Sequence, residues 1–242
     1  MLKILYLYPE LMNLYGDRGN LTVLQRRCAW YGVPVEIIQA GLGEEIPFSS
    51  ADMVFMGGGS DHEKAQITHD LLQHADELMH AVEKGIPVLA VGGAYQILGK
   101  EYIDSDGKAC PGLNLFPFYT ETQTERLSGD IVIECVMEGQ VQKVIGFENH
   151  SGRTWLDDKN LCPWGKVLKG YGNNGEDGTE GFQFQNLVGT YMHGPLLPKN
   201  PQTADFFLKK MFARKDIIIK QPLDDSLENF AHQQVLERLI SS

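Results

Sequence analysis

The chain has 242 residues, of which 43% are hydrophobic, and this is enough for one large α/β domain with its own core. The formal net charge at pH 7 is −11, and no cluster of lysine and arginine stands out. This charge balance argues against DNA or RNA as the main partner.

The apolar N-terminal run MLKILYLY is too short for a signal peptide, and Pro9 and Glu10 close it without a small-residue cleavage site. We therefore expect residues 3–8 to form a first buried strand. No stretch approaches the ~20 apolar residues of a membrane span, and we expect a cytoplasmic protein. The four cysteines show neither paired metal spacing nor a CxxC motif, so we predict free thiols and no metal site; they are Cys28, Cys110, Cys135 and Cys162.

Apolar spacing and turn residues predict the elements that follow the first strand. We expect a helix that Asn20 caps and that runs to Tyr31 before Gly32, strands at residues 35–39 and 52–56, a helix at residues 68–84, and a strand at residues 86–91. The second half is richer in strands, which we expect at residues 130–137, 143–147, 165–169, 181–185 and 187–191. Helices are expected at residues 203–214 and 223–240.

Alternating strands and helices joined by glycine loops predict an α/β fold, a parallel or mixed sheet with helices on both faces. The sequence shows no repeat, low-complexity linker or clear boundary, so we expect one domain over residues 1–242. In such sheets the ligand site lies at the carboxyl ends of the strands. Glycine loops at residues 57–61 and 92–93 directly follow predicted strands, and both should lie at that edge.

The segment VLAVGGAYQ, residues 88–96, has the strand, tight glycine turn and helix of a nucleophile elbow. A helix N-terminus and its neighbouring amides would lower the pKa of a thiol at the apex and stabilise an oxyanion. The apex here is Gly92, which carries no side chain, and a close-packed turn is the alternative interpretation. The GGGSD loop at residues 57–61 could form an anion-binding nest, but it does not match a phosphate loop.

Two side chains outside the glycine loops could take part in chemistry. His193, in the segment GTYMHGP at residues 189–195, follows a predicted strand and could act as a general base. Arg126 could hold a carboxylate through two parallel hydrogen bonds. A structural or surface role is the alternative for His193, and an ordinary surface ion pair is the alternative for Arg126.

The order of these motifs resembles the class I glutamine amidotransferase fold of the cobyric acid synthase type, which is flavodoxin-like. Within that group, three longer segments look like the stand-alone glutaminase subunits of lipid II isoglutaminyl synthases. They are YPELMNLYGDRGN at residues 8–20, GFENHSGRT at residues 146–154 and GYGNNG at residues 170–175. The likeness runs from about residue 5 to about residue 197.

The resemblance implies roles for five residues. Arg126 matches the arginine that holds the glutamine carboxylate, and His193 matches the histidine that assists a cysteine nucleophile. Backbone amides of Gly58, Gly59 and Gly93 match the oxyanion hole. The resemblance also implies that ammonia passes to a Mur-ligase-like synthetase on a separate chain, which amidates D-glutamate of the peptidoglycan precursor. Because the sequence has no phosphate loop and no His, Cys or carboxylate cluster at ligand spacing, we expect no metal or nucleotide cofactor on this chain.

Two positions depart from the wider pattern. Other amidotransferase groups have a glutamate two residues after the histidine, whereas this chain has Pro195, so any acid that orients His193 must come from elsewhere, with the partner chain as one source. The family has cysteine where this chain has Gly92, and without a thiol no thioester can form. An inactive relative, a deliberate substitution and a sequence error are all compatible with Gly92.

We therefore expect a glutaminase subunit by descent that cannot hydrolyse glutamine as it stands. The alternatives are a non-catalytic scaffold subunit that still binds glutamine, and a corrinoid-amidating relative. We expect Gly92, Gly93, Gly58, Gly59, His193 and Arg126 to converge on one pocket.

Overall fold

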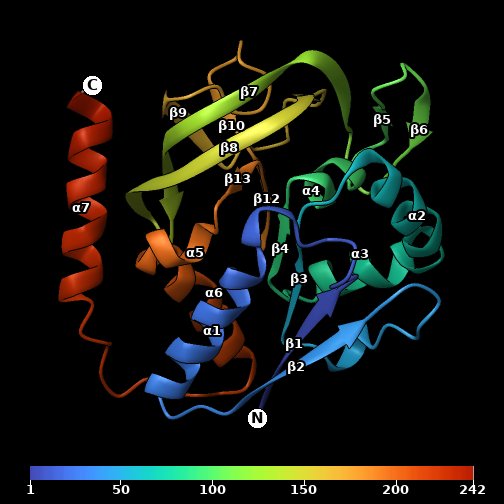
Figure 1. The fold of residues 1–242 in the computed structure, drawn as a ribbon. Coiled ribbons are helices and arrows are strands. Elements are labelled where there is room, and N and C mark those ends of the chain that lie inside the picture. Colours follow the sequence, from blue (N-terminus) through green and yellow to red (C-terminus); the bar gives the residue numbers. More distant parts are fainter. Residues whose placement is uncertain (242) are drawn as a thin grey trace.

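The computed structural model describes residues 1–241, which form two β-sheets surrounded by helices (Figure 1). The first sheet has six strands in the order β11-β12-β4-β3-β1-β2. They are β1 (Leu2–Leu7), β2 (Val35–Ala40), β3 (Met53–Met56), β4 (Val88–Val91), β11 (Phe182–Phe184) and β12 (Leu187–Thr190). All neighbours in this sheet are parallel except β11 and β12, so the predicted mixed α/β sheet is confirmed.

Helices cover both faces of the first sheet because successive strand residues point to opposite sides. Leu5 of β1 packs in an apolar cluster with Leu71, whereas its neighbour Ile4 packs with Leu24 and Phe207. The helices of the first face are α2 (Asp61–Leu71) and α3 (Ala75–Glu83), and those of the second are α1 (Arg18–Trp30) and α6 (Pro201–Arg214). The prediction of helices on both faces is therefore confirmed (Figure 1).

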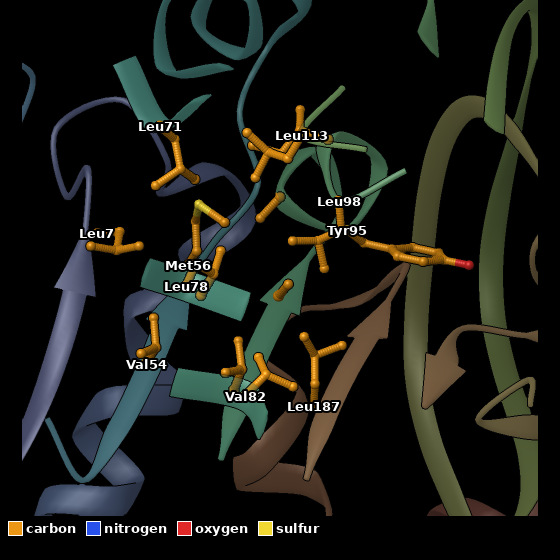
Figure 2. Packing of buried hydrophobic residues seen from close by; sticks show 14 of the residues in the cluster. Leu7, Val54, Met56, Leu71, Leu78, Val82, Tyr95, Leu98, Leu113 and Leu187 are labelled. Carbon is orange, nitrogen blue, oxygen red and sulfur yellow. The ribbon is translucent and has the colours of Figure 1, made fainter. Parts of the chain in front are cut away.

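Figure 2 shows the first cluster from close by, with Val54 and Met56 of β3 facing Leu78 and Val82 of α3. These side chains are at most 1% exposed. Burying each of them contributes about 1.5–3 kcal/mol before conformational entropy is counted. The cluster fixes the parallel strands side by side, so their carboxyl ends meet at one edge.

The second sheet has seven strands and is dominated by a long antiparallel hairpin. Its strands are β5 (Glu101–Ile103), β6 (Ala109–Pro111), β7 (Phe118–Met137), β8 (Gln140–Leu156), β9 (Gly165–Lys169), β10 (Thr179–Glu180) and β13 (Met192–His193). The pairing of β7 with β8 changes register between Thr122 and Leu127. Because β13 pairs with β8, the second sheet lies directly beside the end of β12.

Short helices and the last helix complete the chain. They are the 3-10 helices η1 (Leu14–Gly16), η2 (Phe48–Ser50) and η3 (Leu72–His74), and the α-helices α4 (Gly93–Ile97), α5 (Leu196–Lys199) and α7 (Ser226–Ser241). Among residues 1–241, none of the helices combines the length and the apolar character that crossing a bilayer requires. One buried cluster joins Ile133 of the second sheet to Leu2 of the first.

Several predicted boundaries were wrong. The helix predicted at residues 68–84 begins at Asp61, where Ser60 forms a capping box with Glu63, and it breaks into α2, η3 and α3. The first helix begins at Arg18, and Asn20 lies inside it, where its side chain accepts a hydrogen bond from the Leu197 N–H. The N-terminal half of β7 and the C-terminal half of β8 were missed because their residues alternate less regularly in polarity.

Candidate active site

All six residues that the sequence singled out line one cavity of about 280 Å³. They are Gly58, Gly59, Gly92, Gly93, Arg126 and His193. The cavity lies where β3, β4 and β12 end, which is the edge expected for an open α/β sheet. The prediction that these six residues lie around one pocket is therefore confirmed.

Gly92 stands between β4 and α4 in the conformation of an elbow. Its backbone has φ 57° and ψ −115°, a region that residues with a side chain rarely adopt. The Gly92 N–H donates to the Thr190 carbonyl at 2.8 Å, and the Gly92 carbonyl accepts from the Gln96 N–H at 3.2 Å. A Cβ on residue 92 would lie 2.7 Å from His193 Cε1 and 2.8 Å from Nε2. A side chain on residue 92 would thus lie directly against the histidine ring.

His193 is held by a carboxylate from its own chain. Nδ1 lies 3.2 Å from both side-chain oxygens of Asp17, and both side chains are almost fully buried. An ionised carboxylate only accepts hydrogen bonds, so Nδ1 carries the hydrogen and Nε2, which faces Gly92, is the basic nitrogen. No acid from a partner chain is needed to orient His193, because Asp17 of the same chain lies against its Nδ1 atom.

Asp17 also changes the interpretation of Gly58. The Gly58 N–H donates to Asp17 Oδ2 at 2.9 Å, so this predicted oxyanion-hole donor is already hydrogen-bonded. The amides of Gly59 and Gly93 are the remaining candidates for an oxyanion. A Cβ on Gly58 would lie 2.9 Å from His193 Cε1, and one on Gly57 would overlap the Met12 carbonyl. The glycines of this loop therefore allow the loop after β1 and the histidine to approach the backbone closely.

Arg126 lies in the irregular part of β7, where a change of register redirects side chains. Its Nε donates to Asn149 Oδ1 at 2.9 Å, and its Nη2 donates to the Asn149 carbonyl at 2.8 Å. A second contact of Nη2 is the Tyr15 hydroxyl at 3.3 Å. The guanidinium is exposed but already oriented at the mouth of the cavity, as a carboxylate clamp requires.

A buried polar network that the sequence did not reveal forms another wall of the cavity. Lys64, 3% exposed, pairs with Asp61 at 2.7 Å and donates to the side-chain carbonyl of Gln96. Gln96 in turn donates to the Tyr191 hydroxyl at 3.1 Å. Burial lowers the pKa of Lys64, and the Asp61 carboxylate opposes that shift. Since lysine can only donate, Lys64 fixes which end of the Gln96 amide faces Tyr191.

His150 is a second histidine at this wall. Its ring stacks on Tyr191 with centroids 3.8 Å apart and planes at 5°, and Nδ1 lies 2.7 Å from the Gly152 carbonyl. Burial lowers the pKa of His150, which favours a neutral ring near pH 7. His150 belongs to the segment at residues 146–154 that carried the family resemblance, but neither its spacing nor its residue type indicated that it would face the cavity.

None of the four cysteines lines the cavity. Burial raises the pKa of Cys28 and of Cys135 to about 12, which keeps both thiols protonated and unreactive. Cys110 lies beside Asp104, and burial is the main cause of its raised pKa. Across residues 1–241, no three His, Cys, Asp or Glu side chains gather as metal ligands would.

The sequence could have indicated Asp17 and Tyr15 more strongly than it did. Both lie in the segment at residues 8–20, which directly follows a predicted strand and therefore starts at the ligand-binding edge. Lys64 and Gln96 gave no such signal, because α2 and α4 bring them together only in the folded chain.

Known structures share the fold at low sequence identity. A glutamine amidotransferase from Thermotoga maritima superposes with a TM-score of 0.55 at 15% identity, covering 100% of this chain and 99% of that chain. The glutaminase domain of Trypanosoma brucei CTPS with bound acivicin gives a TM-score of 0.57 at 13% identity, covering 92% and 97%. These likenesses establish the class I glutamine amidotransferase fold.

Sequence relatives are considerably closer. The lipid II isoglutaminyl synthase (glutamine-hydrolyzing) subunit GatD of Staphylococcus aureus is 42% identical over 238 residues, which is 98% of this chain and 96% of that protein. The corresponding subunit of Streptococcus pneumoniae is 38% identical over 204 residues, covering 84% and 77%. A probable cobyric acid synthase of Methanopyrus kandleri is 34% identical over 134 residues, covering 49% and 26%. The model of the CobB/CobQ-like glutamine amidotransferase domain matches residues 3–201, and the chain belongs to this family.

Proposed function

We propose that this chain is by descent the glutaminase subunit of a two-chain amidotransferase, which hydrolyses glutamine and passes ammonia to peptidoglycan synthesis in the cytoplasm. The synthetase on the other chain would be Mur-ligase-like and would amidate D-glutamate of lipid II. One observation carries the proposal: an elbow at Gly92 faces the buried His193–Asp17 pair in a cavity that also presents Arg126. Relatives of nearly the same length bear the name of such a subunit, which supports this choice of reaction.

In this reaction a thiolate at the elbow attacks the glutamine side-chain amide and forms a thioester. Ammonia leaves with a proton that the histidine took from the thiol, and water then cleaves the thioester to glutamate. Gly59 and Gly93 could donate their N–H groups to the oxyanion of the tetrahedral intermediate. Because residue 92 is glycine, the first bond cannot form, and we expect this chain to bind glutamine without hydrolysing it.

The variant Gly92→Cys tests the proposal. We expect it to release glutamate from glutamine, most clearly in the presence of the synthetase, and the double variant Gly92→Cys/His193→Ala to lose that activity. The thiol has room only if the His193 ring moves by a few tenths of an ångström or more, since a Cβ would overlap it. A folded Gly92→Cys chain that binds its partner and yields no more glutamate than the parent would show that the elbow is not catalytic.

The second candidate is a non-catalytic subunit that still binds glutamine and docks on a synthetase. The observation that favours it is the position of His193, whose ring occupies part of the space that a side chain on residue 92 needs. The codon for residue 92 in the source genome separates the two candidates: a cysteine codon supports the enzyme, and a glycine codon supports the binding subunit. A corrinoid-amidating role is less favoured, because this chain matches only 26% of the length of that cobyric acid synthase relative.

A further inference from the structure

Tyr15 lies at the mouth of the cavity in a constrained backbone conformation. It is the middle residue of η1, with φ 57° and ψ 21°, a left-handed region that bulky residues seldom occupy. The preceding Leu14 N–H donates to the Gly58 carbonyl at 3.0 Å, which ties this turn to the glycine loop. The side chain is nevertheless 45% exposed. The backbone is therefore held firmly, while the ring stays accessible from the solvent and from the cavity.

The Tyr15 hydroxyl contacts both the proposed carboxylate clamp, Arg126, and Asn149, the residue that orients it. It accepts one hydrogen bond from Arg126 Nη2 at 3.3 Å and another from Asn149 Nδ2 at 3.1 Å. A phenolic oxygen with two donors directed at it keeps its own hydrogen for donation. The guanidinium polarises that hydroxyl. A hydrogen bond from it to a carboxylate would be stronger than one between two neutral groups, because the acceptor is ionised.

Arg126 retains donors for the same ligand. Its Nε and Nη2 atoms bond to Asn149 and Tyr15, whereas Nη1 makes no hydrogen bond within residues 1–241. Nη1 of Arg126 and the hydroxyl of Tyr15 thus form two neighbouring donors at the rim. Two converging donors match the two oxygens of a carboxylate better than they match a neutral amide.

The ring of the same tyrosine also covers the proposed base. Its centroid lies 4.9 Å from that of His193 and the planes meet at 62°, an edge-on contact. One side chain therefore touches both the group that would hold the carboxylate of glutamine and the group that would act on its amide. The amide end must point toward Gly92, which leaves the carboxylate end at the rim beside Tyr15.

We propose that Tyr15 is a specificity-determining residue for the substrate carboxylate. Its hydroxyl donates to the α-carboxylate of glutamine beside Arg126, and its ring shields the His193 imidazole from solvent. This inference rests on the proposed function, in which glutamine occupies the cavity. The residue accounts for part of the family-like segment at residues 8–20 to which the sequence assigned no role.

Binding to the chain as it exists tests this role, because the absence of a nucleophile lets glutamine bind without turnover. Titration calorimetry would compare L-glutamine with L-glutaminamide, in which the carboxylate is replaced by a neutral amide. We expect Tyr15→Phe to weaken glutamine binding about tenfold, the effect of losing one hydrogen bond to a charged group. Binding of L-glutaminamide, weaker in the parent, should change less than about twofold.

The control is Tyr171→Phe, since Tyr171 is similarly exposed, at 46%, and does not line the cavity. It should leave both affinities unchanged. Equal weakening of both ligands by Tyr15→Phe, or no weakening of either, would overturn the assignment while leaving glutamine binding intact. A parent chain that binds no glutamine would instead refute the proposed function, and the role of Tyr15 would fall with it.

Discussion

Replacing Asp17 by asparagine removes one charge from the centre of the site with little change in shape. The asparagine oxygen can still accept the Gly58 N–H, which lies 2.9 Å from the native carboxylate. Its NH₂ group then faces Nδ1 of His193, where the native contact is 3.2 Å. Two donors cannot share one hydrogen bond, so the ring should move its hydrogen to Nε2. The nitrogen that faces residue 92 would then no longer be basic.

The expected magnitude follows from the charge separation. A unit charge about 4 Å from an imidazolium is worth about 4 kcal/mol at an effective dielectric constant of about 20. At about 1.4 kcal/mol per factor of ten, Asp17→Asn should lower kcat/KM about a thousandfold in the Gly92→Cys background. The same Asp17→Asn substitution in the parent chain, which keeps Gly92, should change glutamine affinity little, because Asp17 does not line the cavity. Stability should fall by about 1.5–3 kcal/mol through the weakened charged hydrogen bonds.

Asp52→Asn is the matched control. Asp52 is also buried, accepts the Lys3 N–H at 2.9 Å and lies 3.2 Å from Lys215 Nζ, but it does not line the cavity. Glutamate release by both variants, with denaturant unfolding alongside, separates catalysis from folding. If folded Asp17→Asn keeps more than a tenth of the activity, or if Asp52→Asn loses as much, the orienting role of Asp17 is refuted.

Two further predictions concern buried ionisable side chains away from the elbow, Glu180 and Arg27. Burial raises the pKa of Glu180 to about 8 from an ordinary 4.5, so the folded state holds a proton that the unfolded state has lost between those pH values. The contribution of Glu180 to the free energy of unfolding therefore falls as pH rises from about 4.5 to about 8. Over that pH range the unfolding free energy of Glu180→Gln, measured with denaturant, should fall less than that of the parent, by a few kcal/mol. Arg27 is buried and its partners Asp205 and Asp225 are partly buried, so Arg27→Met, which leaves both carboxylates without their cation, should cost about 3–5 kcal/mol of unfolding free energy. The exposed pair of Lys209 with Glu138 should contribute less than about 1 kcal/mol, as measured by Lys209→Met. Equal losses of unfolding free energy in Arg27→Met and Lys209→Met would contradict the second expectation. Parallel pH profiles of unfolding free energy for Glu180→Gln and the parent would contradict the first.

The sequence predicted the first sheet well because local signals and buried periodicity agree there. Strands β1, β3 and β4 are apolar on both faces and end at glycines or a proline, so the edge that holds the site followed from topology alone. Gly92 and His193 were correctly placed in one pocket for this reason. The second sheet was predicted less well, since β7 and β8 carry polar residues on one face and lose their regular pairing between Thr122 and Leu127.

Residues of the site that depend on long-range packing could not be read from the chain. Asp17 and His193 are separated by 176 positions, and only the close approach allowed by Gly58 brings them together. Lys64 lay outside every predicted helix and strand, yet it is buried, with a hydrogen bond to Gln96 and a contact of its Nζ with the Tyr102 ring. Charged residues are rarely buried, so composition and periodicity favour the surface for each of them.

The glycine at the elbow is compatible with this fold for a physical reason. An elbow requires a positive φ at its apex, and a side chain there costs about 1–3 kcal/mol of strain that the surrounding structure must offset. Glycine removes that cost, and the Gly92 hydrogen bonds to Thr190 and Gln96 hold the turn without any side chain. Arg126, His193 and Asp17 all lie around it. Under the proposed function these groups remain arranged for glutamine, so binding can be measured in this chain and hydrolysis in its Gly92→Cys variant.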